Sequence, residues 1–99
     1  MTLDLTPAAV SDLRSIHACT LEKWGPEQEQ IYLDSLWARF EQILAAPEKC
    51  RVRNDLFPGC QIAAQGRNVI LFRVQGTLLQ IVRILHGSMD FARHIPKDL

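Results

Sequence analysis

The period of the hydrophobic pattern changes near residue 50, and this change restricts the fold more than any other feature of the chain. From residue 7 to residue 46, apolar side chains recur at helical spacing, whereas from residue 60 to residue 86 short apolar runs are separated by glycine-containing turns. Helices followed by strands, with no alternation between the two, are typical of an α+β fold. The sequence therefore predicts helices packed on one face of a mainly antiparallel sheet.

Two helices are expected, over residues 7–23 and 26–46. Thr6 supplies a hydroxyl N-cap, and Pro7 occupies the first helical position. Gly25 and Pro26 end the first helix and allow the second to begin, and Pro47 closes the second. So short a break predicts an antiparallel helical hairpin.

Strands are expected over residues 60–64, 69–74 and 78–86, with a further short strand over residues 2–5. The turns between the last three strands are short, which predicts an antiparallel meander. The expected architecture is therefore a short N-terminal strand and a helical hairpin packed on a curved, mainly antiparallel sheet of three to four strands.

The turn at residues 75–76 decides which side chains share a face of this sheet. With a two-residue loop, Arg73 and Arg83 lie on opposite faces, whereas one extra loop residue pairs Val74 with Leu78 and places both arginines, together with Ile81, on the same face. We expect the longer loop, because burying Arg83 beneath the helices without a partner would be costly.

The strands over residues 69–74 and 78–86 carry apolar side chains on both faces. The helices can cover one face, but an antiparallel sheet usually exposes polar side chains on the other. Two covers for this second face are open: a binding partner, which is the preferred interpretation, or the chain's own C-terminal residues.

Length and charge limit the class of protein. At 99 residues and 11.3 kDa the chain suits a single domain over residues 1–99, which argues against a large cofactor-bearing enzyme. Residues 1–48 hold eight acids and three bases, net −5, and residues 49–99 hold eight bases and three acids, net +5. The basic half predicts an acidic partner segment or a nucleic acid, unless the acidic half answers it within the molecule.

The chain shows no feature of a membrane or exported protein. No apolar run approaches the roughly 20 residues of a membrane span. The N-terminus has neither the basic nor the hydrophobic region of a secretory signal. Cys19, Cys50 and Cys60 are odd in number and lack Cys-x-x-Cys spacing, which predicts reduced thiols and a cytoplasmic protein.

Residues with catalytic or ligand chemistry are few. The three histidines stand at no zinc-site spacing, and neither a metal nor a cofactor is expected. His86 and Asp90 are open to two interpretations. They form an acid–base dyad or, as preferred, His86 is simply a histidine at the end of a strand near a helix cap. His17 is interpreted as a core or boundary residue, and Trp24 and Trp37 are interpreted as core residues and not as a binding platform.

Several segments occur in a characteristic order. Residues 12–16 lie in the first expected helix, Trp24-Gly25 at the hairpin tip, Tyr32 and Leu36 in the second helix, and residues 51–56 in the connection to the strands. Residues 70–74 (ILFRV), 81–86 (IVRILH) and 89–90 (MD) are the most specific. In this order and spacing they resemble the ParE branch of the RelE/ParE superfamily of type II toxin–antitoxin toxins, over nearly the whole chain.

The resemblance implies a fold and a function. It implies the fold described above and a cognate antitoxin whose tail wraps the sheet and the helical hairpin. It also implies inhibition of DNA gyrase by protein binding and a role in plasmid stabilisation, without membrane association or sequence-specific nucleic-acid binding. RelE-type members of the superfamily instead cut mRNA on the ribosome.

The ribonuclease residues of RelE-type members can be sought at matching positions. Those members place basic side chains on the strands and near the C-terminus, with an aromatic hydroxyl in the tail. Cleavage of a phosphodiester needs a base, an acid and positive charge beside the phosphorane. The residues at the matching positions are Gln61, Ala63, Val69, Ser88 and His94. A ribonuclease site would therefore have to be improvised from Arg67, Arg73, Arg83, His86 or His94, so the chain is expected not to be an enzyme.

Two sets of contact residues are expected. The antitoxin is expected to cover the hairpin groove and the outer sheet face, where Leu71→Glu should abolish binding and leave the fold intact. The antitoxin set is Val69, Leu71, Arg73, Ile81, Arg83 and Leu85; the target set is Arg83, His86, Met89, Asp90, Arg93 and His94.

Two alternatives to gyrase inhibition remain for the function of the chain. One is a ribonuclease, and the other is a non-toxic module that only binds an antitoxin.

Overall fold

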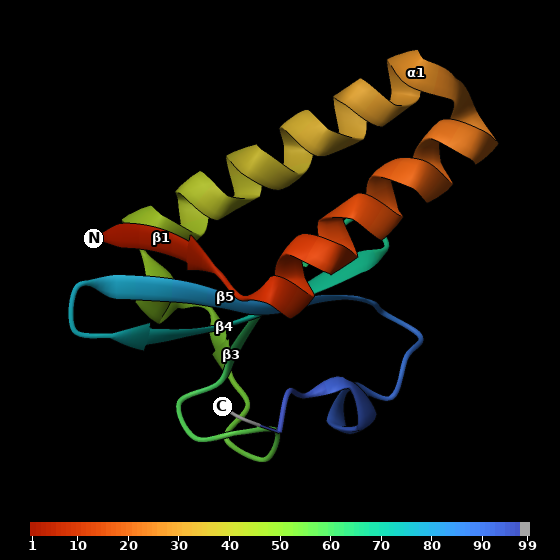
Figure 1. Ribbon diagram of the computed structural model, residues 1–99. Coiled ribbons are helices and arrows are strands. Elements are labelled where there is room, and N and C mark those ends of the chain that lie inside the picture. The colour runs from red at the N-terminus through yellow and green to blue at the C-terminus, as the bar shows by residue number, and fades with distance from the viewer. Residues whose placement is uncertain (98–99) are drawn as a thin grey trace.

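The computed structural model describes residues 1–97, in which a helical hairpin lies on one face of a five-stranded sheet (Figure 1). The sheet order is β1-β5-β4-β3-β2; β1 runs parallel to β5, and every other neighbouring pair is antiparallel. The expected α+β fold is confirmed, with β2 as a strand beyond those expected. The elements are β1 (Thr2–Leu5), α1 (Pro7–Ala45), η1 (Pro47–Lys49), β2 (Arg51–Val52), β3 (Gln61–Gln65), β4 (Asn68–Gln75), β5 (Leu78–His86) and η2 (Phe91–His94).

The helix α1 is the expected hairpin, because the chain reverses at Gly25. This residue has φ 86° and ψ 171°, a conformation that glycine adopts without steric cost. The first arm (residues 7–24) and the second arm (residues 26–45) run in opposite directions (Figure 1). His17 on the first arm contacts the carboxylate of Glu29 on the second, which gives this buried acid a partner.

The start of the first arm is tied to the interior strand β5 by Thr6. Its hydroxyl oxygen accepts a hydrogen bond from the Ala9 backbone N–H at 3.1 Å, as the N-cap prediction requires. The same hydroxyl donates to the Val82 carbonyl at 2.7 Å. One side chain therefore caps the helix and sets its entry point above the sheet.

The main core fills the space between α1 and the sheet. Both arms contribute to it, and the sheet contributes side chains from β3, β4 and β5. The exclusion of this apolar surface from water is the principal term that holds the hairpin on the sheet. The buried members are Ala9, Leu36, Phe40, Ile43, Ala63, Ile70, Phe72, Leu79, Ile81 and Ile84.

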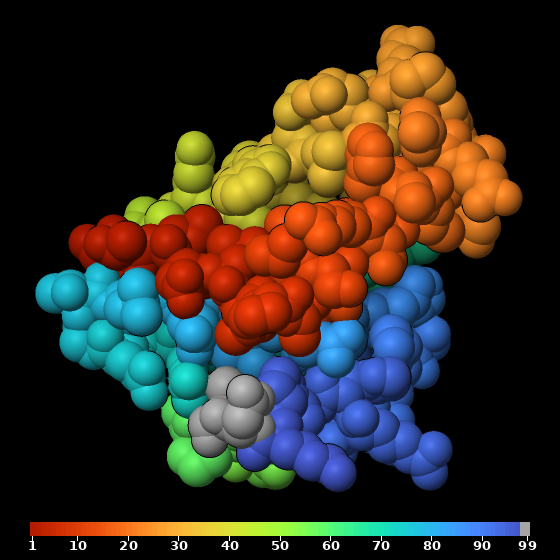
Figure 2. Space-filling model, viewed as in Figure 1, coloured from red at the N-terminus to blue at the C-terminus, as the bar shows by residue number. Residues whose placement is uncertain are grey.

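A second core lies on the opposite face of the sheet and is covered by the chain itself. Leu71, Val82 and Leu85 pack beneath Phe57 from the segment before β3 and beneath the half-buried residues Phe91 and Ile95. These two segments form the side of the molecule opposite α1 (Figure 2). The preferred interpretation, that a binding partner covers this face, is therefore wrong, and the alternative of a C-terminal cover is confirmed.

The register of β4 and β5 differs from the expected one. Val74 pairs with Leu79, not with Leu78, and Gly76 and Thr77 form the loop. A β-bulge then leaves Val82 as an extra residue, because Leu71 pairs with Arg83 while the next residue of β4 pairs with Ile81. The expectation that Arg73 shares a face with Ile81 is therefore wrong. Arg73 pairs with Gln80, whose side-chain oxygen accepts its Nε–H at 2.9 Å.

The three cysteines are free and differ in accessibility: Cys19 is exposed, Cys50 is half-buried and Cys60 is buried. Burial raises the pKa of the Cys60 thiol to about 11. Iodoacetamide at about pH 8 is therefore expected to alkylate Cys19 in the native protein and to leave Cys60 unmodified, which mass spectrometry of digested protein will show. All three thiols should react in urea, and equal labelling of Cys19 and Cys60 in the native protein would contradict the buried position of Cys60.

The same thiol makes stability depend on alkaline pH. The unfolded chain loses the Cys60 proton near the ordinary thiol pKa of 9.0, whereas the folded chain holds it up to about 11. The contribution of the buried thiol to folding stability is complete below pH 9 and is lost as the pH rises through 11.

Within residues 1–97, no helix has the length and hydropathy that a membrane span needs.

Candidate functional site

An open cleft of about 600 Å³ lies between the two arms of α1, the β3–β4 turn and the end of β5. Its volume falls within the range of protein ligand pockets, roughly 300–1,000 Å³. The cleft has polar walls, and its floor is formed by the half-buried Ile16 and by β5 at Ile84 and Leu85, whose side chains are almost fully buried in the main and second cores. The remaining lining residues are Asp12, Ser15, Cys19, Thr20, Lys23, Trp24, Gln28, Tyr32, Arg67, Asn68, Arg83, His86 and Met89.

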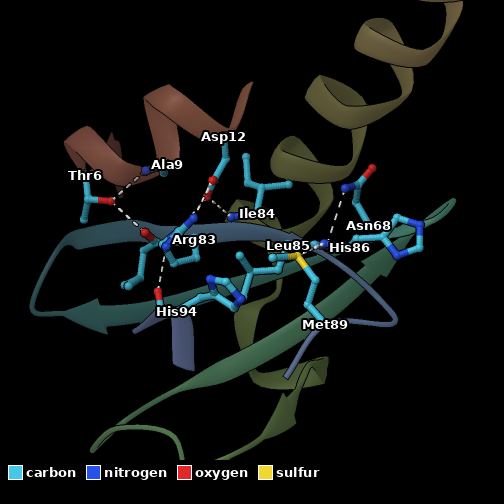
Figure 3. Close-up of polar contacts among 11 residues, drawn as sticks. Thr6, Ala9, Asp12, Asn68, Arg83, Ile84, Leu85, His86, Met89 and His94 are labelled. Carbon is cyan, nitrogen blue, oxygen red and sulfur yellow. Dashed lines mark hydrogen bonds and ion pairs between the residues drawn. The ribbon is translucent and has the colours of Figure 1, made fainter. Parts of the chain in front are cut away.

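A half-buried ion pair lies in the lining of the cleft. Arg83 on β5 donates from Nε and Nη2 to the two carboxylate oxygens of Asp12, at 2.8 and 2.6 Å (Figure 3). Its Nη1 donates to the His94 carbonyl at 2.7 Å, and Asp12 also accepts the Ile84 backbone N–H at 2.9 Å. The hydrogen bonds that Arg83 donates to the Asp12 carboxylate raise the pKa of the Arg83 guanidinium. Arg83 therefore connects the first arm, β5 and η2.

The wall formed by the β3–β4 turn is held by Tyr32 of the second arm. Its hydroxyl lies within hydrogen-bond reach of the Gln65 carbonyl, at 2.9 Å, and of Asn68 Oδ1. Gly66 lies so close that a Cβ atom there would come within 2.8 Å of the tyrosine ring, and its φ of +57° also favours glycine. Burial raises the pKa of the Tyr32 hydroxyl, and the Arg67 backbone N–H and charge oppose that shift.

The outer rim of the cleft is formed by Trp24 at the hairpin tip. The side chain of Trp24 is 55% exposed, and the guanidinium carbon of Arg67 lies 5.3 Å from the centroid of its ring. This distance is within the range of a cation–π contact. The contact places Arg67, from the β3–β4 turn, beside the hairpin tip at the cleft entrance.

A family model described as "ParE toxin of type II toxin-antitoxin system, parDE" matches residues 3–91. The chain belongs to the ParE toxin family. The resemblance to the ParE branch is thereby confirmed, and the chain is a ParE-type toxin of a type II toxin–antitoxin system.

Curated relatives and a solved structure agree with this membership of the ParE family. Toxin ParE1 of Mycobacterium tuberculosis and Toxin ParE1 of Caulobacter vibrioides are each 33% identical to this chain, over 92 and 91 residues respectively. Each match covers 92% of this chain and 94% of the relative. A structure described as "Chromosomal ParDE TA system from P. aeruginosa" has a TM-score of 0.74 at 24% identity, covering 87% of this chain and 95% of that chain. This likeness shows that the fold is shared.

The residues expected to bind the antitoxin do not form one surface of this ParE toxin. Leu71 and Ile81 are fully buried and Leu85 is 2% exposed, with Ile81 on the α1 side of the sheet and the other two in the second core. Arg73 donates a hydrogen bond to the side chain of Gln80, and Arg83 donates to the carboxylate of Asp12. The half-buried Val69 packs against the second core. The expectation that these residues form one exposed outer face is therefore wrong, because the segments before β3 and after β5 cover that face. Their part in binding the antitoxin stays a prediction.

The residues expected to contact the target lie around the end of β5. His86 and Met89 line the cleft, and the His86 backbone N–H donates to Met89 Sδ at 3.3 Å (Figure 3). His86 Nδ1 accepts the Ser88 N–H at 3.2 Å, while Asp90 forms an exposed ion pair with Arg93 at 3.4 Å. His86 and Asp90 are therefore partnered separately, as preferred over a dyad.

The cations proposed for an improvised ribonuclease site are brought together only in part. Arg67, Arg83 and His86 line the same cleft. Arg73 lies on β4 away from the cleft and donates a hydrogen bond to Gln80. The backbone carbonyl of His94 accepts a hydrogen bond from Arg83. Of these residues, Arg83 is neutralised by its ion pair with Asp12.

The sequence did not predict three residues that line the cleft, namely Lys23, Trp24 and Arg67. Trp24 and Trp37, interpreted there as core residues, are 55% and 46% exposed. The position of Trp24 next to Gly25-Pro26 was the available signal, because a hairpin tip has few neighbours to bury it. Lys23 and Arg67 carried no signal of their own, since only the folded chain brings the hairpin tip to the β3–β4 turn.

Proposed function

We propose that this ParE toxin inhibits DNA gyrase by binding it as a protein, without catalysing a reaction of its own. The observation that carries the proposal is the pairing of Arg83 with Asp12, which removes this cation of the cleft from a role in stabilising a phosphorane. The positions at which RelE-type members carry basic residues hold Gln61, Ala63, Val69 and Ser88 here, which supports the same proposal.

The proposed gyrase-contact segment is the end of β5 with the loop that follows it. His86, Met89 and Asp90 are exposed there, and so is Arg93 in η2. This segment combines an imidazole, a thioether and an exposed ion pair on one short stretch of chain, which suits a protein partner.

We further propose that a cognate antitoxin neutralises the toxin by placing part of its tail in the cleft. The cleft has an apolar floor, and the exposed side chains Trp24 and Met89 stand at its edge. Because His86 and Met89 belong both to the cleft lining and to the proposed gyrase-contact segment, a tail seated in the cleft covers part of that segment. The toxin then cannot engage gyrase while the antitoxin is bound.

Purified toxin tests the target directly. We expect it to suppress supercoiling of relaxed plasmid by gyrase and to trap cleaved plasmid when the reaction is stopped with detergent and protease. Unchanged supercoiling at a large molar excess of toxin would reject gyrase as the target. Primer extension on a translated mRNA examines the alternative, and codon-phased cuts that depend on the toxin would establish ribonuclease activity instead.

A substitution that fills the cleft tests where the antitoxin binds. Ser15 is exposed on the first arm and lines the cleft, so Ser15→Trp should occupy the space without disturbing the core. We expect the antitoxin Kd, measured by calorimetry, to rise roughly a hundredfold, about 2.8 kcal/mol. Ser11→Trp is the matched control, because Ser11 is exposed one turn earlier on the same arm and does not line the cleft. Equal affinities of the two variants would place the antitoxin elsewhere.

A further inference from the structure

Two cations at the cleft stand without an acidic partner among residues 1–97. The cleft is lined by the acid Asp12 and by three Lys or Arg side chains, Lys23, Arg67 and Arg83. Asp12 and Arg83 neutralise each other through two hydrogen bonds. Neither Lys23 nor Arg67 forms an ion pair with a carboxylate of the described chain. The cleft entrance therefore carries two uncompensated positive charges.

These two charges are positioned by the fold, although they come from distant parts of the sequence. Lys23 precedes the hairpin tip, and Arg67 lies in the β3–β4 turn over the ring of Trp24. The turn itself is fixed by the bond from the Tyr32 hydroxyl to the Gln65 carbonyl and by the close approach of Gly66 to the tyrosine ring. Arg67 is thus presented at a defined place on the cleft wall.

The floor between these charges is apolar. The half-buried side chain of Ile16 contributes from the first arm, and β5 borders the floor at Ile84 and Leu85, whose side chains are almost fully buried in the main and second cores. A segment that fills the cleft must bring apolar side chains to this floor and carboxylates to its entrance. A basic segment would place like charges together at the entrance, which is a cost that discriminates between partners.

We propose that Lys23 and Arg67 are specificity-determining residues that select antitoxin segments with a carboxylate beside a large apolar side chain. This inference rests on the proposed docking of the antitoxin in the cleft and adds the chemistry of the segment that docks. The cleft takes acidic amphipathic segments and rejects basic ones.

Selection of short random peptides on phage tests this preference with a defined probe. The wild-type toxin should enrich peptides that combine Asp or Glu with a large apolar residue, and K23E/R67E should enrich peptides with Lys or Arg instead. The best wild-type peptide should lose at least about tenfold in affinity for K23E/R67E by fluorescence anisotropy. Binding should also be lost in Ser15→Trp, which confirms that the peptide occupies the cleft.

Two further variants keep the result interpretable. R14E/K49E makes the same change in net charge at exposed positions outside the cleft lining, and it should bind the wild-type peptide normally. K23Q/R67Q removes the charges without reversing them and should show a smaller loss than K23E/R67E. The same enriched peptides for wild type and K23E/R67E, an equal loss in R14E/K49E, or no enrichment at all would each overturn the inference.

The outcome is separable from that of the proposed function. Growth arrest on induction and gyrase inhibition report on the toxin, whereas the peptide preference reports on the cleft entrance. A toxin that inhibits gyrase but shows no acidic preference would overturn only the role of Lys23 and Arg67. A chain that selects acidic peptides but leaves gyrase unaffected would overturn only the target.

Discussion

Leu71→Glu is expected to unfold this toxin rather than to produce a folded protein that no longer binds antitoxin. Leu71 is fully buried in the second core, beneath Phe57 and near Phe91. A glutamate there loses the packing of the leucine and places a carboxylate in apolar surroundings, at a combined cost above about 4 kcal/mol. Small domains have a total stability of about 5–15 kcal/mol, so a loss of this size removes a large share of it, and nearly all of it at the lower end of that range. Urea denaturation followed by circular dichroism measures the change.

Val52→Glu is the matched control for this substitution. Val52 lies on the edge strand β2 and is 57% exposed, so the same chemical change there should leave the urea midpoint nearly unchanged. If Leu71→Glu had a midpoint close to that of Val52→Glu, then the cover formed by the residues before β3 and after β5 would not be part of the folded toxin.

Asp12→Ala is expected to give the second large effect. The side chain of Arg83 is only 20% exposed, and the substitution leaves its guanidinium without a counter-charge. It also removes the Asp12 oxygen that accepts the Ile84 N–H. Breaking a largely buried pair from one side should cost about 3 kcal/mol and lower Tm by more than about 10 °C. Differential scanning calorimetry measures both values.

Asp55→Ala controls for the loss of an arginine–carboxylate pair as such. Asp55 also accepts two hydrogen bonds from an arginine, Arg53, but its side chain is 64% exposed, and solvent replaces what the substitution removes. Its Tm should stay close to that of the wild type. Equal shifts for Asp12→Ala and Asp55→Ala would show that Arg83 has no special part in joining α1, β5 and η2. Replacing both partners with Asp12→Leu/Arg83→Met should recover part of the loss, because no unpaired charge remains.

Local patterns were sufficient to predict the elements of this fold. Helical spacing on either side of Gly25-Pro26 predicted the hairpin, and the observed α1 ends one residue before the expected boundary. The run from Leu78 to His86 was predicted with its observed bounds. These features are encoded by neighbours in the sequence, and tertiary contacts reinforce them. The two-residue strand β2 was missed because so short a strand leaves no period to detect.

Features that depend on distant contacts could not be predicted in this way. Side-chain alternation has a period of two, so a single bulged residue at Val82 changes every facing assignment beyond it. That bulge lies where Thr6 binds the Val82 carbonyl and where Arg83 meets Asp12, both on segments more than 70 residues away. The cleft likewise joins Trp24 to Arg67, which no local pattern connects.

The strand order has a consequence for the order in which the fold can form. The interior strand β5 follows the other four strands in the sequence, yet β1 has β5 as its neighbour and β4 requires it on one side. Until residues 78–86 have left the ribosome, the N-terminal strand has nowhere to pair, the first arm lacks its anchor at Val82, and the cleft lacks its floor. The N-terminal strand, the first arm and the cleft therefore depend on contacts between segments more than 70 residues apart in the sequence, and such long-range contacts form late in folding.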